Sequence, residues 1–158
     1  QARMGSTRLP GKVLLPLSGG PVVDHVVRRA AAIPGVDAVV VATSTRTLDD
    51  GLAAHVEASG LAQVVRGPEM DCLARFVLAQ QATGADALVR ITADCPLLDP
   101  EVSGQVVARF REAGGKLDYV SNVFSRRTWP RGLDTEEFVS LMAAHFGKRG
   151  LQVTVMPK

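Results

Sequence analysis

Two runs of apolar and β-branched residues, Ala38–Thr43 and Ala87–Thr92, constrain the fold more than any other feature of the sequence. The first run is unbroken and the second is interrupted only by Arg90; such runs are typical of strands buried on both faces of a parallel sheet. Polar residues follow each run directly: Ser44 and Thr45 after the first, Asp94 after the second. Because ligands of open α/β sheets bind at the carboxyl ends of strands, this edge is the expected site.

Segments with helical or strand periodicity alternate along the rest of the chain. They predict a three-layer α/β/α sandwich with a mostly parallel sheet. A length of 158 residues, with 46% hydrophobic and 22% charged residues, fits one domain spanning 1–158. The predicted helices are 22–30, 48–58, a helix capped by Asp71, 102–110 and 136–145, and the predicted further strands are 63–66, 118–122 and 151–156.

The opening stretch, residues 1–12, carries three cations, two hydroxyls and two glycines. These groups suit phosphate binding, since glycine allows close backbone approach, hydroxyls donate hydrogen bonds, and Arg and Lys neutralise charge. A P-loop is excluded because five residues separate Gly5 from Gly11 and Val13 follows Lys12. A polar surface loop with incidental basic residues stays the alternative. Because phosphate loops of α/β proteins usually follow a buried strand, we expect an apolar strand before Gln1.

Two carboxylates follow the second apolar run, and their surroundings predict different roles. Asp99 precedes Pro100 and Glu101, which is typical of a helix N-cap. Asp94 has no helix to cap, so we predict that it binds Mg²⁺, which proteins hold through one or two carboxylates plus substrate phosphates. A turn or cap residue is the alternative for Asp94 considered alone.

Charge and cysteine content exclude several classes of protein. A net charge of +2 is too small for an extended nucleic-acid interface. No apolar run reaches membrane-spanning length and no signal peptide is visible, so a cytoplasmic protein without membrane contact is expected. Cys72 and Cys95 lack the spacing of a zinc site or disulfide framework. The basic loop 126–131, with Trp129, suits an acidic or phosphorylated sugar, or else an exposed or oligomer-forming surface.

Several motifs occur in an order that resembles a known family: QARMGSTRLPGK, VVATS, RGPEMDCLARF, VRITADCPLLDPE, DYVSN and RGLDTEEF. The chain resembles the cytidylyltransferases of spore coat polysaccharide biosynthesis, which are similar to CMP-acylneuraminate and CMP-Kdo synthetases. The resemblance covers most of residues 1–138. It implies a Rossmann-like nucleotide-diphospho-sugar transferase fold, Mg²⁺ as cofactor and a homodimer.

The resemblance also implies roles for individual residues. Arg3, Arg8, Lys12 and Asp94 are expected to be catalytic, with Asp94 as the metal ligand. Family members run past this length and carry a late aspartate as a second metal ligand, whereas the alignment ends after Phe138. We therefore expect either that part of the C-terminal region is missing or that the protein is a shortened relative of the family. The expected nucleotide-binding residues are Ala2, Arg3, Met4, Gly5, Ser6, Arg8, Lys12, Arg66, Gly67 and Thr92, and the expected substrate-binding residues are Ser121, Asn122 and Asp134.

These observations predict transfer of CMP from CTP to a sugar acid or sugar phosphate, with release of pyrophosphate, in surface polysaccharide or glycoconjugate biosynthesis. Two alternatives remain open. One is a glycosyltransferase that uses sugar nucleotides, although its aspartate-any-aspartate signature is absent from the sequence. The other is a non-catalytic sugar-nucleotide-binding domain.

Overall fold

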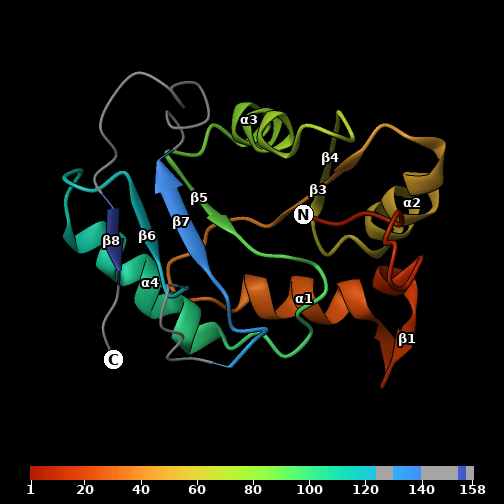
Figure 1. Ribbon diagram of the computed structural model, residues 1–158, viewed down its shortest axis with the longest axis horizontal. Coiled ribbons are helices and arrows are strands. Elements are labelled where there is room, and N and C mark those ends of the chain that lie inside the picture. The colour runs from red at the N-terminus through yellow and green to blue at the C-terminus, as the bar shows by residue number, and fades with distance from the viewer. Residues whose placement is uncertain (124–129, 140–152, 156–158) are drawn as a thin grey trace.

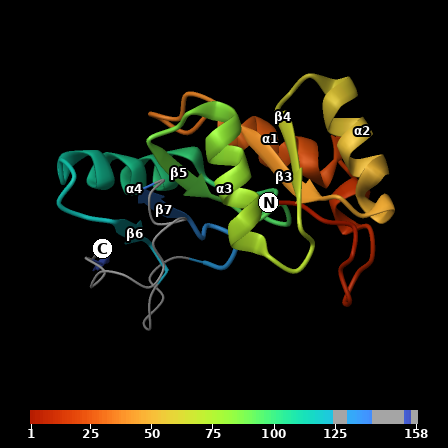
Figure 2. The same cartoon turned by 90° about the horizontal axis from the view of Figure 1, so that it is seen from above.

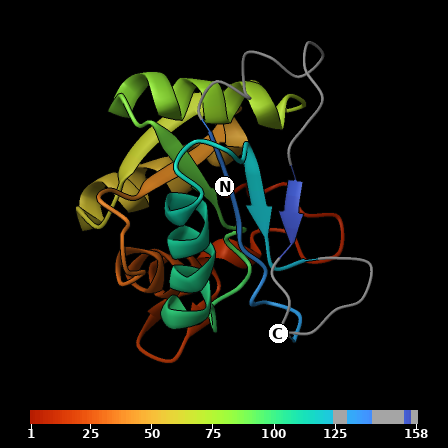
Figure 3. The same cartoon turned by 90° about the vertical axis from the view of Figure 1, so that its left-hand side faces the viewer.

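The computed structural model describes residues 1–123, 130–139 and 153–155. Figure 1 shows strands in a middle layer, with α3 on one side of them and α1 and α4 on the other. Figure 3 shows the same separation of α3 from α1 and α4, and Figure 2 looks down on the sheet from the side of α3. The α/β/α sandwich predicted from the alternating pattern is therefore confirmed. The helices are α1 (Val22–Ala31), α2 (Asp50–Ser59), α3 (Cys72–Thr83) and α4 (Pro100–Glu112), with short 3-10 helices at Lys12–Leu14 and Thr47–Asp49.

The strands form three hydrogen-bonded groups in the described part of the chain. β1 and β2 make a small antiparallel hairpin, and β3 pairs with β4 in parallel. The third group has the order β5-β7-β6-β8, in which β7 runs antiparallel to both neighbours and β8 runs parallel to β6. The strands are β1 (Pro16–Leu17), β2 (Gly20–Pro21), β3 (Val40–Ser44), β4 (Gln63–Gly67), β5 (Ala87–Arg90), β6 (Tyr119–Ser121), β7 (Glu136–Val139) and β8 (Val153–Val155).

One prediction is wrong in this region. Residues 136–139 form strand β7, whereas the sequence predicted a helix over 136–145; residues 140–145 lie outside the described ranges. The two glutamates that open this segment favour a helix locally. Pairing with β5 on one edge and β6 on the other overrides that preference, because it gives the backbone hydrogen bonds on both sides.

The apolar faces of the helices cover the strands from both sides. Val23 and Val27 of α1 pack with Leu52 and Val56 of α2 and with Val41 of β3 in the largest buried cluster. On the opposite side, Phe76 of α3 packs against Leu88 and Tyr119. Ala30 and Ile33, at the end of α1, pack with Leu98 and with Val107 of α4.

The predicted helix caps are confirmed. Asp71 accepts a hydrogen bond from the N–H of Ala74 at 2.8 Å, and Asp99 accepts from Glu101 at 2.8 Å and Val102 at 3.1 Å. These caps satisfy N–H groups that the first turns of α3 and α4 leave without intrahelical partners. They fix where the loops that follow β4 and β5 end.

Candidate active site

The basic loop at the start of the chain folds back on the carbonyl of Met4. That oxygen accepts hydrogen bonds from the N–H groups of Ser6 and Gly11, each at 2.9 Å. Gly11 has φ 69°, a left-handed conformation that residues with a side chain rarely adopt. The N–H of Ser6 therefore donates within the loop and is not available to bind an anion. Within the described residues, the N–H groups of Gly5, Thr7 and Arg8 have no hydrogen-bond partner.

Asp49 anchors this loop to the carboxyl end of β3. Its side chain is 2% exposed; Oδ1 accepts from the N–H of Met4 at 2.7 Å and Oδ2 accepts from the hydroxyl of Ser44. Ser44 in turn accepts from the N–H of Arg46 at 3.2 Å. Asp49 has no ion-pair partner in the described part of the chain. The Asp49 side chain is thus buried next to the basic loop without an ion-pair partner among the described residues. Burying such a group costs free energy unless its hydrogen bonds are made.

Lys12 and Asp94 meet across the carboxyl edge of the sheet. The Nζ of Lys12 donates to Oδ2 of Asp94, and the two side chains are 25% and 37% exposed. Burial by itself would raise the pKa of the Asp94 carboxyl, but hydrogen bonds from Lys12 and Thr92 and the charge of Lys12 lower that pKa below its ordinary value. Asp94 is therefore ionised at neutral pH and bound to the ammonium of Lys12.

A cleft of about 350 Å³ lies over this pair. It brings together seven of the residues that the sequence analysis assigned to the nucleotide and Asp94, the predicted metal ligand; Arg3 and Arg8 are exposed there. The side chain of Ala2 is 4% exposed and belongs to the core. The predicted residues that line the cleft are Ala2, Arg3, Gly5, Ser6, Arg8, Lys12, Thr92 and Asp94.

Three of the residues predicted to bind the nucleotide do not line this cleft and instead stabilise the structure around it: Met4, Arg66 and Gly67. The carbonyl of Met4 accepts the hydrogen bonds from Ser6 and Gly11 that close the basic loop. The guanidinium of Arg66 donates to the carbonyls of Ser44 at 2.9 Å and Arg46 at 3.0 Å and to the carboxylate of Asp50 at 2.6 Å. It therefore joins the ends of β3 and β4 beside the cleft.

Gly67 is required by packing between β4 and α3. A Cβ at this position would lie 2.8 Å from Cδ1 of Leu78 and 3.0 Å from Cγ of Arg75. Both distances are shorter than normal contacts between carbon atoms. The glycine thus permits α3 to approach the end of β4, which fixes where the following loop, residues 68–71, begins.

Arg75 holds the loop 68–71 against the start of the chain. Its side chain is 1% exposed; Nη1 donates to the carbonyl of Glu69 at 2.8 Å and Nη2 to Oε1 of Gln1 at 3.0 Å. Arg3 reaches the same carbonyl of Glu69 at 3.0 Å. The loop after β4 is thereby tied to the basic loop.

The residues predicted to bind the sugar lie beyond Asp94. The amide of Asn122 donates to the carbonyl of Leu133 at 2.7 Å and accepts from the N–H of Thr135 at 2.9 Å. The hydroxyl of Ser121 is buried and accepts from the N–H of Val123 at 3.0 Å. The Asn122 side chain thus holds the segment 133–135 beside β6, whereas Ser121 bonds to the backbone of Val123 at the end of β6.

Asp94 and Asp134 both lie close enough to Cys95 for their charges to act on its thiol. Burial raises the pKa of the Cys95 thiol, and the negative charges of Asp94 and Asp134 add to this effect. Cys95 is therefore a protonated thiol rather than a nucleophile at neutral pH. In the predicted sugar loop 126–131, residues 126–129, with Trp129, lie outside the described ranges, and Arg131 is exposed.

Asp49 and Arg75 are site-supporting residues that the sequence analysis missed. Asp49 precedes α2 in the sequence and looks like a helix cap, yet its side chain makes no capping hydrogen bond there. Arg75 lies within an apolar helical pattern and looks like a solvated residue. Nothing in the sequence pattern distinguishes them, because their partners are 45 and 74 residues away.

The profile of a family described as cytidylyltransferase matches residues 1–130. The chain belongs to the cytidylyltransferase family. It is 40% identical over 126 residues to the spore coat polysaccharide biosynthesis protein SpsF of Bacillus subtilis (strain 168), a match that covers 77% of this chain and 52% of that protein. It is 34% identical over 148 residues to a 3-deoxy-manno-octulosonate cytidylyltransferase of Anaeromyxobacter sp. (strain Fw109-5), which covers 92% and 57% of the two chains. The family predicted from the motifs is thus confirmed.

A solved structure shows the same fold. The chain superposes on a cytidylyltransferase from Leptospira borgpetersenii serovar Hardjo-bovis (strain JB197) with a TM-score of 0.83 and 33% identity, over 90% of this chain and 59% of that one. This cytidylyltransferase chain therefore spans little more than half the length of the relatives it matches. No helix in the described ranges is long and apolar enough to cross a bilayer.

Proposed function

We propose that this cytidylyltransferase transfers CMP from CTP to a sugar acid or sugar phosphate and releases pyrophosphate. The observation that carries the proposal is the juxtaposition of Lys12 and Asp94 at the carboxyl edge of the sheet, with Arg3 and Arg8 exposed at the same cleft. Three cations from one loop suit a triphosphate, and a carboxylate beside them suits a divalent cation that the triphosphate shares.

The reaction is an in-line displacement at the α-phosphorus of CTP. An acceptor oxygen forms a bond to this phosphorus, and the bond from the phosphorus to the oxygen that bridges to the β-phosphate breaks. Pyrophosphate leaves with the electron pair, and the proton of a hydroxyl acceptor passes to solvent or to pyrophosphate. The residues of this site contribute orientation and charge neutralisation.

In this proposal the ammonium of Lys12 can pair with either of two anions, the carboxylate of Asp94 or the triphosphate of CTP. It is bound to Asp94 in the structure. A triphosphate entering between Arg3, Arg8 and Lys12 attracts the ammonium with more charge than one carboxylate has. Lys12 then neutralises the phosphates, while Asp94 is released to act as a ligand. The N–H groups of Gly5, Thr7 and Arg8 are the backbone donors left to meet the phosphate oxygens.

The donor chemistry fits Mg²⁺. In the described ranges no three His, Cys, Asp or Glu side chains gather as a metal site, but Mg²⁺ in nucleotide enzymes is commonly held by one or two carboxylates and by phosphate oxygens. Asp94 is ionised and half-exposed, so it is the residue that would hold the ion. Bound Mg²⁺ supplies charge neutralisation for the phosphates and for the departing pyrophosphate.

The acceptor class rests on the relatives' names and on the surroundings of Asp94. Asp134 lies near Cys95, which follows Asp94 directly in the sequence. The Cys95 thiol is protonated, and the described imidazoles of His25 and His55 bond to Leu17 and Asp24 instead. The absence of a thiol or imidazole base among the described residues of the site suits an acceptor that is already anionic or readily ionised. A role in surface polysaccharide biosynthesis, a homodimer and a cytoplasmic location are parts of the same proposal.

Pyrophosphate release tests the proposal. The protein is assayed with CTP, Mg²⁺ and a panel of sugar acids and sugar phosphates, with each component omitted in turn. Release that needs CTP, Mg²⁺ and one acceptor supports it. CTP binding without turnover by any acceptor would favour the non-catalytic binding domain, and turnover of a sugar nucleotide would favour a glycosyltransferase.

A further inference from the structure

Glu69 is the point at which arginines from three parts of the chain meet. Its carbonyl accepts hydrogen bonds from Nη1 of Arg3 at 3.0 Å and from Nη1 of Arg75 at 2.8 Å. Its carboxylate oxygen Oε2 pairs with Nη1 of Arg46 at 3.0 Å. The three arginines come from the basic loop, from α3 and from the turn after β3. One residue of the loop 68–71 therefore joins the proposed phosphate site to α3 and to the end of β3.

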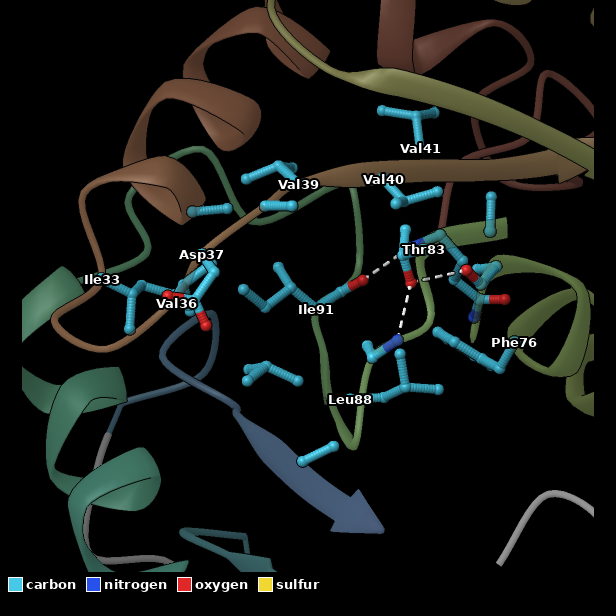
Figure 4. Close-up of a pocket in the computed structure, with 18 of the residues that line it drawn as sticks. Ile33, Val36, Asp37, Val39, Val40, Val41, Phe76, Thr83, Leu88 and Ile91 are labelled. Carbon is cyan, nitrogen blue, oxygen red and sulfur yellow. Dashed lines mark hydrogen bonds between the residues drawn. The ribbon is translucent and has the colours of Figure 1, made fainter. Parts of the chain in front are cut away.

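The support for Arg46 is the carboxyl end of β3. Further back, residues 39–41 line an apolar cavity of about 640 Å³ (Figure 4), whereas the chain becomes polar from Ser44 onwards. The N–H of Arg46 donates to Oγ of Ser44 at 3.2 Å. Its carbonyl accepts from the N–H of Asp49 at 2.9 Å and from Nη2 of Arg66 at 3.0 Å. None of these bonds uses the side chain of Arg46, so its guanidinium can be replaced while the backbone stays in place.

The two arginines that hold Glu69 from outside the basic loop differ in burial. Arg75 is 1% exposed and also donates to Gln1, so its loss would disturb the packing of α3. The side chains of Arg46 and Glu69 are 65% and 30% exposed. Partly exposed ion pairs contribute little to the free energy of folding. The pair of Arg46 with Glu69 can therefore be broken without unfolding the chain.

The loop 68–71 is fixed at both ends, and Glu69 lies between them. Packing at Gly67 sets its start, and the helix cap at Asp71 sets its end. Arg75 holds the carbonyl of Glu69 from the buried side, but a single anchor leaves a residue free to rotate about it. The bond from the Glu69 carboxylate to Arg46 is a second anchor. Together the two anchors fix the direction of the carbonyl to which the basic loop is bound.

The carboxylate of Glu69 also lies beside the cleft. Gly5 lines the cleft, and a Cβ at this position would lie 3.8 Å from Oε1 of Glu69. The N–H of Gly5 is one of the donors proposed to meet the phosphate oxygens. An unpaired carboxylate this close would repel a triphosphate, and pairing with Arg46 offsets that charge.

We propose that Arg46 is a positioning residue for the triphosphate. It holds the side chain of Glu69, which fixes the carbonyl that orients Arg3, and it neutralises a carboxylate beside Gly5. This role rests on the proposed function, because the triphosphate is that of CTP. Arg46 acts through Glu69 and does not touch the nucleotide. Its loss should weaken nucleotide binding and leave the chemical step unchanged, because Lys12 stays in place.

Variants of the ion pair test this role. They are Arg46→Met, Glu69→Gln and the double variant Arg46→Glu/Glu69→Arg, which restores the pair with its polarity reversed. Arg109→Met is the control, because it removes an equal charge from an exposed ion pair on α4, a helix that contributes no residue to the cleft. Calorimetry measures the Kd of CTP with Mg²⁺ and the Kd of inorganic triphosphate. Steady-state pyrophosphate release and thermal unfolding give kcat, KM and the midpoint.

Arg46→Met should raise the Kd of both ligands by roughly three- to tenfold, because an orienting contact and a neutralising charge are lost together. Its kcat should change by less than about twofold and its midpoint by less than about 2 °C. Glu69→Gln should change the Kd by less than about twofold, because the amide oxygen still accepts from Arg46 and no carboxylate remains beside Gly5. The reversed pair should return the Kd to within about twofold of the wild-type value or below it.

Inorganic triphosphate separates this role from the proposed function. If the wild-type protein binds inorganic triphosphate but not CTP, the proposed function fails, whereas the comparison of Arg46→Met with Arg109→Met still decides the role of Arg46. If it binds neither ligand, both are wrong.

Three further results would overturn the role of Arg46. The first is an equal Kd for Arg46→Met and Arg109→Met. The second is a reversed pair that binds as weakly as Arg46→Met, which would show that Arg46 contacts the nucleotide itself. The third is a fall in kcat at unchanged KM, or a midpoint lowered by more than about 5 °C together with weaker binding, which would assign Arg46 to the chemical step or to stability.

Discussion

The ammonium of Lys12 donates a hydrogen bond to the carboxylate of Asp94, 82 residues later in the sequence. One residue comes from the basic loop that follows Ala2, and the other follows β5. Their contact places a cation of the loop proposed to bind phosphate against the carboxylate proposed to hold the metal. Each of the two side chains can therefore be tested against a matched residue that lies away from the cleft.

Replacing Lys12 by Ala should lower kcat/KM for CTP by roughly 10²-fold or more, because a donor aimed at developing phosphate charge contributes about 2.7–4 kcal/mol. The fold should survive, since the lost ion pair is partly exposed. Lys116→Ala removes an equal charge from an exposed position and serves as control. Steady-state pyrophosphate release measures both. Equal rates for the two variants would remove Lys12 from the mechanism.

Asp94 and Asp99 should separate catalysis from stability. Asp94→Asn should abolish Mg²⁺-dependent pyrophosphate release but change the unfolding free energy by less than about 1 kcal/mol, because the pair with Lys12 is partly exposed. Asp99→Ala removes the cap of α4 and should cost about 0.5–2 kcal/mol of stability with activity retained at low temperature. Thermal midpoints and Mg²⁺ titrations of activity check both. An Asp94→Asn protein with an unchanged Mg²⁺ requirement places the metal elsewhere.

Asp49→Asn should weaken CTP binding without touching the substrate. The amide oxygen of the new side chain still accepts from the N–H of Met4, but it is a weaker acceptor than a carboxylate oxygen. The amide NH₂ group cannot accept from the hydroxyl of Ser44 as Oδ2 of Asp49 does. We expect a stability loss of about 1–3 kcal/mol and a KM for CTP that rises more than kcat falls. Asp37→Asn is the control, since that carboxylate is 97% exposed. A kcat loss with unchanged KM would contradict the positioning role.

Gly67→Ala should destabilise the protein by about 1–3 kcal/mol, because its Cβ would meet Leu78 and Arg75 at 3.0 Å or less. Gly51→Ala is the matched substitution. That glycine lies inside α2 with open space around it, so alanine should stabilise by about 0.5–1 kcal/mol. Denaturant unfolding of both variants measures the two changes in unfolding free energy, which should have opposite signs. A neutral Gly67→Ala would mean that α3 moves readily away from β4.

CTP should bind more tightly than ATP or GTP. This expectation follows from the proposed transfer of CMP from CTP. Calorimetric titrations with CTP, ATP and GTP in the presence of Mg²⁺ measure the preference. Equal or tighter binding of a purine nucleotide would refute it.

Much of the fold follows from local sequence. The apolar runs form β3 and β5, and the caps at Asp71 and Asp99 open α3 and α4. These features depend on residues close in the sequence, so periodicity and capping chemistry predict them. The composition of the basic loop also needed no structure, because any phosphate loop requires cations and glycines.

Other features depend on neighbours far along the chain. Glu136 and Glu137 favour a helix locally, yet both edges of β7 pair with strands that the sequence does not place beside it. Asp49 resembles a helix cap until Met4 is seen to donate to it. The sequence predicts Arg66 and Gly67 as nucleotide-binding residues, and only the structure adds that Arg66 braces two strand ends and that Gly67 admits α3.

The sequence by itself determined the alternation of strands and helices, the two helix caps and the chemistry of the basic loop, because each is set within a few neighbouring residues. Only the tertiary structure decided that Lys12 meets Asp94, that Asp49 anchors Met4, and that β7 is a strand. Those outcomes depend on which strand edges and loops the packed layers bring together. These long-range contacts form because they lower the free energy of the whole chain, even where a single segment alone would prefer another conformation.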